Sequence, residues 1–198
     1  MKAIPFEPWI GKNYGKSKLL VLSESAYSWQ EDGSLVHPGP SHPTCQVLHW
    51  MEHFGKQKYH TAMARALCGK EMPTYEERKR AWNGVAFSIF VPGTVGLGAR
   101  NRPKREMFDK AVGPFLDLLE NIRPHKVLVT GKAMWNQMPG CQAYLCDGLQ
   151  AYMLSNGPLV WCLAVPHPCN REKGEGFAWE RVAAAIRAFR AASFPLKI

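Results

Sequence analysis

The chain has 198 residues, enough for one sizeable hydrophobic core but not for two. Its hydrophobic fraction of 46% and aromatic fraction of 11% are those of a globular protein and exclude an intrinsically disordered chain. Lysine and arginine number 25 against 16 acidic residues, and the resulting net charge of +9 favours a polyanionic partner. We therefore expect one domain over residues 1–198.

The beginning of the chain contains prolines and charges and no apolar run of signal-peptide length. No apolar run anywhere approaches the roughly 20 residues that span a bilayer. The cysteines are scattered without a CxxC pair, at Cys45, Cys68, Cys141, Cys146, Cys162 and Cys169. We expect them to be reduced thiols in a cytoplasmic, nucleoid-associated protein with no metal and no cofactor. A monomer without an obligatory protein partner or a membrane is the simplest expectation.

The first predicted strand covers residues 18–22 (KLLVL), an apolar run that stops at a polar segment. The second covers residues 84–91 (GVAFSIFV) and ends at a Pro-Gly pair. Strands that are apolar on both faces belong in the middle of a sheet. A helix is predicted over residues 104–122, because apolar residues recur there at helical spacing: Phe108, Val112, Phe115, Leu118, Leu119 and Ile122.

A third strand is predicted over residues 125–130 (HKVLVT) and a fourth over residues 159–165 (LVWCLAV). A second helix follows over residues 179–192, which are rich in alanine and arginine. Strands that alternate with helices predict a three-layer α/β/α sandwich with a central, mainly parallel four-stranded sheet. Sites in such sheets form where the carboxyl ends of the strands meet their loops. The segments to examine are therefore those that directly follow the strands.

Four segments, in order along the chain, resemble motifs of the uracil-DNA glycosylase superfamily. Residues 23–27 (SESAY) are similar to the GESHY version of the loop that holds a water-activating acid and an aromatic residue. Residues 82–91 resemble the strand whose end reads the target base, and residues 119–135 resemble the helix, strand and G-K/R turn. Residues 167–169 (HPC) resemble the HPS motif, which precedes a loop that enters the DNA. Each motif is short, and their order and strand context make the combination moderately specific.

Two positions depart from the family pattern. Ser25 stands where the family has its catalytic Asp, and the nearest carboxylate is Glu24. The base-reading strand ends in Ser88, Ile89 and Phe90 instead of the Asn that pairs with uracil. We therefore expect glycosylase chemistry on a base other than uracil, such as one with the bulky modifications found in phage DNA.

The resemblance implies two catalytic residues. His167 would donate a hydrogen bond to the departing base, and Glu24 would position or deprotonate the attacking water. Structural roles are the alternatives, since a histidine can cap a turn and an acid can cap the segment after a strand. The base pocket would be lined by Ser23, Ser25, Tyr27, Ser88, Ile89 and Phe90, with Tyr27 stacking on the flipped base or packing as a core tyrosine.

The expected DNA contacts lie in two loops and at a helix start. The densest basic segment follows a glycine-rich stretch, residues 93–98, that we expect to be flexible, and the glycine-spaced loop after the HPC motif could fill the gap left by an extruded nucleotide. The candidates are Arg100, Arg102, Lys104, Lys132, Cys169, Asn170 and Arg171.

Other interpretations of the sequence remain open. A catalytically inactive member of the same fold that binds DNA or a nucleotide is favoured by the missing Asp. A DNA-mimic protein is disfavoured by the positive charge. A cysteine protease with Cys169 as its nucleophile is disfavoured, because the sequence contains no second His or Asn motif typical of such an enzyme. A binding module should release no base from any DNA, and this separates it from an enzyme.

Overall fold

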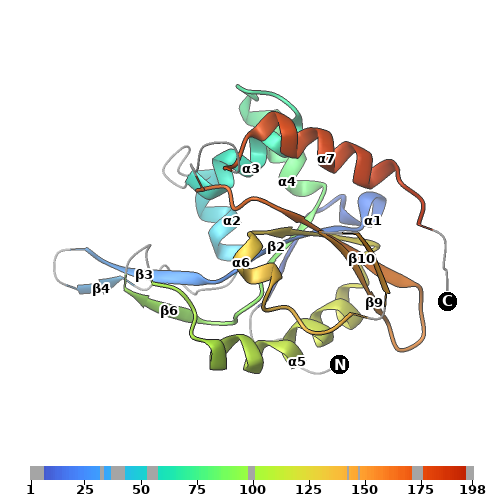
Figure 1. The fold of residues 1–198 in the computed structure, drawn as a ribbon. Helices are drawn as coiled ribbons and strands as arrows, with labels where there is room; N and C mark the ends of the chain where they lie inside the picture. The colour runs from blue at the N-terminus through green and yellow to red at the C-terminus, as the bar shows by residue number, and fades with distance from the viewer. Residues whose placement is uncertain are drawn as a thin grey trace.

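The structure is a computed structural model that describes residues 7–31, 34–36, 43–52, 58–97, 101–141, 143–146, 148–170 and 176–194. Figure 1 shows a central β-sheet with helices on both faces. The elements follow in the order β1 (Trp9–Ile10), α1 (Tyr14–Ser17), β2 (Leu19–Ser23), β3 (Ala26–Glu31), β4 (Ser34–Val36), α2 (Pro43–Glu52), α3 (Lys58–Cys68), α4 (Tyr75–Asn83), β5 (Ala86–Ile89), β6 (Thr94–Leu97), α5 (Arg105–Ile122), β7 (Lys126–Thr130), α6 (Lys132–Trp135), β8 (Ala143–Cys146), β9 (Leu149–Met153), β10 (Leu159–Val165) and α7 (Trp179–Ala191).

The central sheet has the strand order β1-β5-β2-β7-β10-β9-β8 within the described part of the chain. Its middle, β5-β2-β7-β10, is parallel throughout and consists of the strands predicted from the sequence. The prediction of a mixed α/β protein with a mainly parallel sheet is confirmed, but the prediction of four strands is wrong. Three further strands, β1, β9 and β8, extend the sheet in antiparallel pairings. They lie toward its edges, where short or mixed sequences suffice for pairing.

A second, smaller sheet has the order β4-β3-β6 and projects to one side of the molecule (Figure 1). The glycine-rich stretch expected to be flexible forms β6, which pairs in parallel with β3 at Ala26 and Ser28. This pairing joins segments almost seventy residues apart, with an irregular register, and local composition gives no signal for it.

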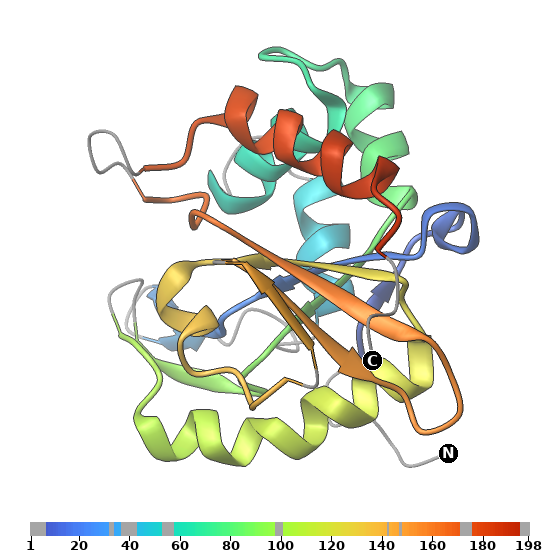
Figure 2. The same ribbon diagram turned by 45° about the vertical axis from the view of Figure 1, so that its right-hand side comes forward.

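Alternate residues of the parallel strands pack into two separate cores, one on each face of the sheet. Leu19, Val21 and Phe87 pack with residues of α2, α3, α4 and α7 on one face. Leu20 and Leu22 pack on the other face with residues of α5. Figure 2 shows α7 and α5 on opposite sides of the sheet. This two-sided burial explains why the sequences of these strands are apolar without alternation.

Both predicted helices are present, as α5 and α7, with ends within one residue of the expectation. The sequence reading missed α2, α3 and α4, all of which cover one face of the sheet. For α4 a signal was available: Thr74 and Glu77 form a capping box, in which each side chain accepts a hydrogen bond from the other residue's backbone N–H. In the described ranges, no helix has the length and apolar character needed to cross a membrane.

Candidate functional site

The strand order predicts a binding crevice beside the carboxyl end of β2. From β2 the chain first adds β5 on one side and then β7 and β10 on the other, so the order reverses at β2. Ligands of open α/β sheets bind outside the carboxyl ends of the strands at such a reversal. Glu24 directly follows β2, Gly131 directly follows β7, and His167 follows β10. The two predicted catalytic residues therefore come from strand ends on the same edge of the sheet.

Glu24 is held in a nearly buried position. Only 7% of the surface of Glu24 is exposed to solvent. The carbonyl oxygen of Glu24 accepts a hydrogen bond of 2.9 Å from the backbone N–H of Val91, and that of Ser23 accepts one of 2.8 Å from Phe90. These bonds tie the segment after β2 to the segment after β5, so the position of the Glu24 backbone is fixed by two strands.

The Glu24 carboxylate pairs with the guanidinium of Arg102. The Nη2 atom of Arg102 donates to Oε2 at 2.8 Å, and Nε donates to Oε1 at 3.4 Å. This two-point geometry matches the planar fork of an arginine to a carboxylate. The sequence suggested Arg102 only as a phosphate contact. The structure brings it to the edge of the site from the segment that precedes α5, with 60% of its side chain still exposed.

The imidazole of His167 is oriented by the turn that follows it. Its Nδ1 atom accepts a hydrogen bond of 3.2 Å from the backbone N–H of Cys169. A neutral ring with an accepting Nδ1 carries its proton on Nε2. Burial lowers the pKa of His167; the charge of Glu24 acts to raise this pKa and the charge of Arg102 acts to lower it. His167 is thus a neutral hydrogen-bond donor on which the charges of Glu24 and Arg102 act.

Tyr59 of α3 links three strand ends and is a site residue that the sequence reading missed. Its hydroxyl lies 2.9 Å from Oγ1 of Thr130, which itself donates to the carbonyl of Leu22 at 2.9 Å. Ser23 also lies near the hydroxyl, and burial raises the pKa of Tyr59. Its ring centroid lies 5.6 Å from that of His167. Tyr59 therefore forms a wall against which the imidazole packs.

Gly131, at the end of β7 next to His167, has a backbone conformation that favours glycine. Its φ of +128° lies in a region that L side chains rarely adopt. A Cβ atom at this position would lie 3.6 Å from the Cβ of His167. The N–H of Gly131 donates to the carbonyl of Val165 at 2.8 Å, which joins the ends of β7 and β10.

The predicted pocket residues include three serines near the strand ends and two apolar residues of the cores. Ser23 is buried beside Tyr59, and Oγ of Ser25 is enclosed without a hydrogen-bond partner among the described residues. Ser88 is buried within β5. Ile89 and Phe90 pack in the two cores, and the Phe90 ring lies against two rings of α5, with centroids 6.2 and 5.2 Å away. The side chain of Tyr27 lies outside the described residues.

The predicted DNA contacts are placed as follows. Lys104 precedes α5 and Lys132 begins α6, and both are exposed. Cys169 is exposed, and Asn170 closes the turn by donating its N–H to the His167 carbonyl at 2.8 Å. Arg100 and Arg171 lie outside the described residues.

A cavity of about 490 Å³ lies beside the His167 turn. It does not include Glu24 or His167, but Pro168 and Asn170 of the turn contribute to its wall. The other lining residues come from α3, from the start of α7 and from the segment before it: Ala62, Arg65, Gly176, Phe177, Ala178, Trp179, Glu180 and Arg181. Aromatic and arginine side chains thus line a hollow next to the strand-end crevice.

No protein-family model matches the chain, and no curated protein matches its sequence. Within the described ranges, no three His, Cys, Asp or Glu side chains lie together in a group that could hold a metal ion. We therefore infer a function from the motifs and from the geometry of Glu24, Arg102, Tyr59 and His167.

Proposed function

We propose that the chain is a DNA glycosylase that flips out a base other than uracil, such as a modified base, and hydrolyses its N-glycosidic bond. Such an activity would serve DNA repair or defence against phage DNA with modified bases. The observation that carries the proposal is the convergence of Glu24 and His167, from the ends of β2 and β10, on one edge of the sheet. A carboxylate and a neutral imidazole donor are the two groups that this reaction requires.

His167 would stabilise the departing base. Cleavage of the N-glycosidic bond leaves negative charge on the base, and a donor held in place beforehand lowers the barrier most effectively. The bond from Cys169 to Nδ1 leaves Nε2–H as the donor of the neutral ring. Because burial lowers the pKa of His167, the ring stays neutral at physiological pH and donates without losing a proton.

Glu24 would orient the attacking water. A carboxylate has about four lone-pair directions on its two oxygens. Arg102 occupies one direction on each oxygen, so acceptor positions remain for a water molecule. The ion pair also fixes the plane of the carboxylate, as an enzyme needs for a positioned base.

The pocket residues support a base other than uracil. A buried hydroxyl, Oγ of Ser25, has no hydrogen-bond partner in the described part of the chain. An unpaired buried hydroxyl is costly and gains most when a ligand supplies the missing bond. No side-chain amide stands at the end of β5, where Ser88 is followed by core residues. The donor–acceptor match to uracil is therefore absent at this strand.

The charges around the crevice support a DNA partner. Lys104 and Lys132 are exposed near the strand ends, and the adjacent cavity contains Arg65 and Arg181. Cations placed around a site in this way contact backbone phosphates and set the position of the duplex. Trp179 lines the same cavity and offers an aromatic face to an unstacked base.

A catalytically inactive DNA- or nucleotide-binding protein is the second candidate. The ion pair between Glu24 and Arg102 favours it, because a carboxylate that only stabilises the fold would look the same. Ser25 in place of the family's Asp favours it as well.

A base-release assay separates the two candidates. Purified protein is incubated with DNAs that contain uracil, hypoxanthine, damaged bases, or the modified and glucosylated cytosines of phages. Free bases are identified by mass spectrometry, and abasic sites are scored by alkali cleavage. The glycosylase proposal predicts one released base with a matching alkali-labile site. Intact DNA across the whole panel, with retained DNA binding, is the result that the inactive binder predicts.

A further inference from the structure

A basic cleft lies at the opposite end of the sheet from Glu24 and His167. Its volume is about 440 Å³, within the range of small-molecule sites. It opens beside Ser17, which precedes β2, and Gly84, which precedes β5. The length of β2, about 16 Å at 3.3 Å per residue, separates this cleft from the strand-end crevice.

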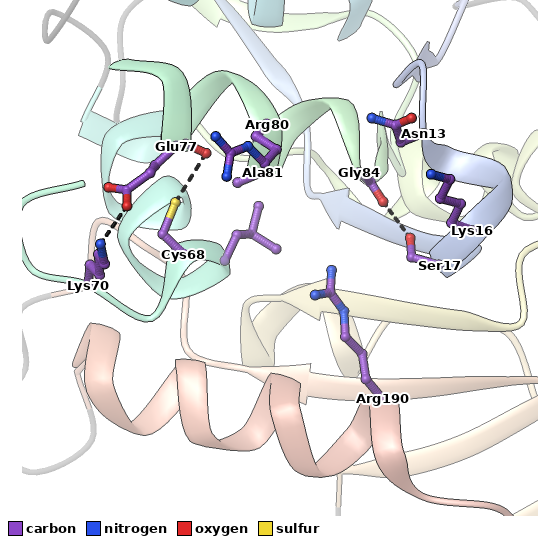
Figure 3. A pocket seen from close by; sticks show the side chains of 11 residues that line it. Asn13, Lys16, Ser17, Cys68, Lys70, Glu77, Arg80, Ala81, Gly84 and Arg190 are labelled. Atoms are coloured by element: carbon purple, nitrogen blue, oxygen red, sulfur yellow. Dashed lines mark hydrogen bonds and ion pairs between the residues drawn. The ribbon is translucent and has the colours of Figure 1, made fainter. Parts of the chain in front are cut away.

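The cleft is lined by side chains from four helices (Figure 3). Arg190 extends from the end of α7 on one side, Arg80 projects from α4 on the other, and Lys16 belongs to α1. The complete lining is Asn13, Lys16, Ser17, Leu67, Cys68, Lys70, Glu77, Arg80, Ala81, Gly84 and Arg190. Four of these side chains are cationic and one is a carboxylate.

The carboxylate in the lining of the cleft, that of Glu77, already has partners within the protein. Glu77 forms an ion pair with Lys70 and accepts the N–H of Thr74 at 2.9 Å as part of the helix cap. Across the described ranges, Lys16, Arg80 and Arg190 have no carboxylate within ion-pair distance. Three cations therefore face one hollow without a counter-charge from the described chain.

The Arg190 end of the cleft is fixed by the fold. The carbonyl of Arg190 accepts a hydrogen bond of 2.8 Å from Nζ of Lys126, which also donates to the carbonyl of Ala192 at 2.8 Å. The last turn of α7 is thus anchored to the start of β7. Partial burial lowers the pKa of Arg190, although the residue remains exposed to solvent.

We propose that this cleft binds a small ligand with two or more phosphate groups, such as a nucleoside triphosphate. Arginine forks bind phosphate oxygens at two points, and lysines add point charges. Cations on opposite sides of the hollow are too many for one monophosphate, and a chain of phosphates can reach several of them. Leu67 and Ala81 give the cleft an apolar portion against which the rest of the ligand can pack. A concave hollow between helices suits a small ligand better than the convex surface of a duplex.

The test is calorimetric titration of the full chain with tripolyphosphate, ATP, adenosine and a short DNA duplex. We expect saturable binding of tripolyphosphate and ATP, and none of adenosine. Arg80→Ala and Arg190→Ala should each weaken this binding about tenfold or more, the loss of one charge-assisted contact. Arg190→Lys should recover part of the affinity, because it keeps the charge and loses the fork.

Two matched controls lie on the same helices outside the cleft. Lys79 neighbours Arg80 on α4 but lies over the ring of Tyr75, and Arg187 lies on α7 one turn before Arg190. Lys79→Ala and Arg187→Ala should leave the affinity for tripolyphosphate within about twofold. An equal loss in these controls would mean unspecific attraction to a basic protein and would overturn the proposal.

Two further results would also overturn it. One is the absence of saturable binding of either polyphosphate to wild-type protein whose circular dichroism shows that it is folded. The other is duplex binding that depends on Arg80 and Arg190 while polyphosphate binding does not, which would make the cleft a DNA contact. These readouts involve no base release, so they stand or fall independently of the glycosylase proposal.

Discussion

Glu24 and Arg102 form a two-point ion pair, with N–O distances of 2.8 and 3.4 Å, at the end of the first parallel strand. The two residues are 78 positions apart in the chain, and the pair connects β2 to the segment before α5. Because Glu24 is nearly buried, this contact compensates for the loss of water around its charge. The pair is therefore a structural contact, and it also orients the Glu24 carboxylate that we propose positions the attacking water.

Removal of Arg102 should destabilise the fold measurably. Arg102→Ala leaves the buried Glu24 carboxylate without its cation, and we expect the free energy of unfolding to fall by about 1–2 kcal/mol, discounted for the exposure of the arginine. Urea denaturation measures this change. The double variant Glu24→Gln/Arg102→Ala should recover part of the loss, because no charge then remains buried. A double variant less stable than Arg102→Ala alone would contradict the account of the pair.

His167 should exist as the Nε2–H tautomer with a depressed pKa. Nitrogen-15 NMR of the imidazole rings reports both the tautomer and the titration of each histidine. We expect the pKa of His167 to lie below the usual value for histidine, because burial disfavours the charged ring. Tyr59→Ala removes the ring that packs against it and should shift this pKa back toward the usual value. Tyr59→Phe keeps the ring and serves as the control. A dominant Nδ1–H tautomer would contradict the bond from Cys169.

His60 should make the stability of the protein fall on mild acidification. The residue is buried among Trp50, Trp82 and Phe87, and neither ring nitrogen has a partner among the described residues. Burial lowers its pKa to about 3. Between about pH 6.5 and this value the unfolded chain binds a proton that the folded chain does not, so the contribution is complete above pH 6.5 and is lost as the pH falls.

The measurement for His60 is the free energy of unfolding between pH 7 and pH 5, where carboxylates contribute least. Wild-type protein should lose stability with a slope to which His60 contributes up to about 1.4 kcal/mol per pH unit. His60→Leu should have a flatter profile, and His125→Leu, at an exposed histidine, should keep the wild-type slope. Parallel profiles for wild type and His60→Leu would show that His60 does not cause the effect.

Lys104 and Lys132 should contribute to DNA affinity through phosphates alone. Each substitution by alanine should weaken binding to all sequences alike and reduce the slope of log K against log salt by about one. Fluorescence anisotropy with a labelled duplex at several salt concentrations measures this slope. Lys79→Ala, on α4 over the ring of Tyr75, is the matched control and should leave the slope unchanged. An unchanged slope for both Lys104→Ala and Lys132→Ala would remove them from the proposed DNA surface.

The sequence predicted the elements whose signals are local. Buried parallel strands such as β2 and β10 are continuous apolar runs, and α5 has apolar residues at helical spacing, so their positions follow from short-range patterns. Placement of Glu24 and His167 on one edge also followed, because parallel strands end on the same side. The antiparallel strands β1, β9 and β8 were missed because they are short or mixed in character.

Contacts between distant segments could not be predicted in the same way. Tyr59 enters the site from α3, and only the packing of that helix on the sheet shows that its ring meets His167. Arg102 was interpreted from its basic neighbours as a phosphate contact, and nothing local indicates a carboxylate partner. Phe90 was assigned to the pocket, but it lies in the core because its side chain faces α5. Side chains alternate between the two faces of a strand, so the direction of a residue just after a strand cannot be predicted without knowing where the strand ends.

The most direct test of the glycosylase proposal is base release by the His167→Ala variant. Wild-type protein and the variant are compared on whichever DNA of the panel yields a free base, with His125→Ala, at an exposed histidine on the opposite end of the sheet, as the matched control. Loss of one preorganised donor should slow single-turnover release by about 100- to 1000-fold while DNA affinity changes little. His125→Ala should release the base at the wild-type rate. Equal rates for wild type and His167→Ala would contradict the proposed role of His167, and no release from any DNA would contradict the enzyme itself.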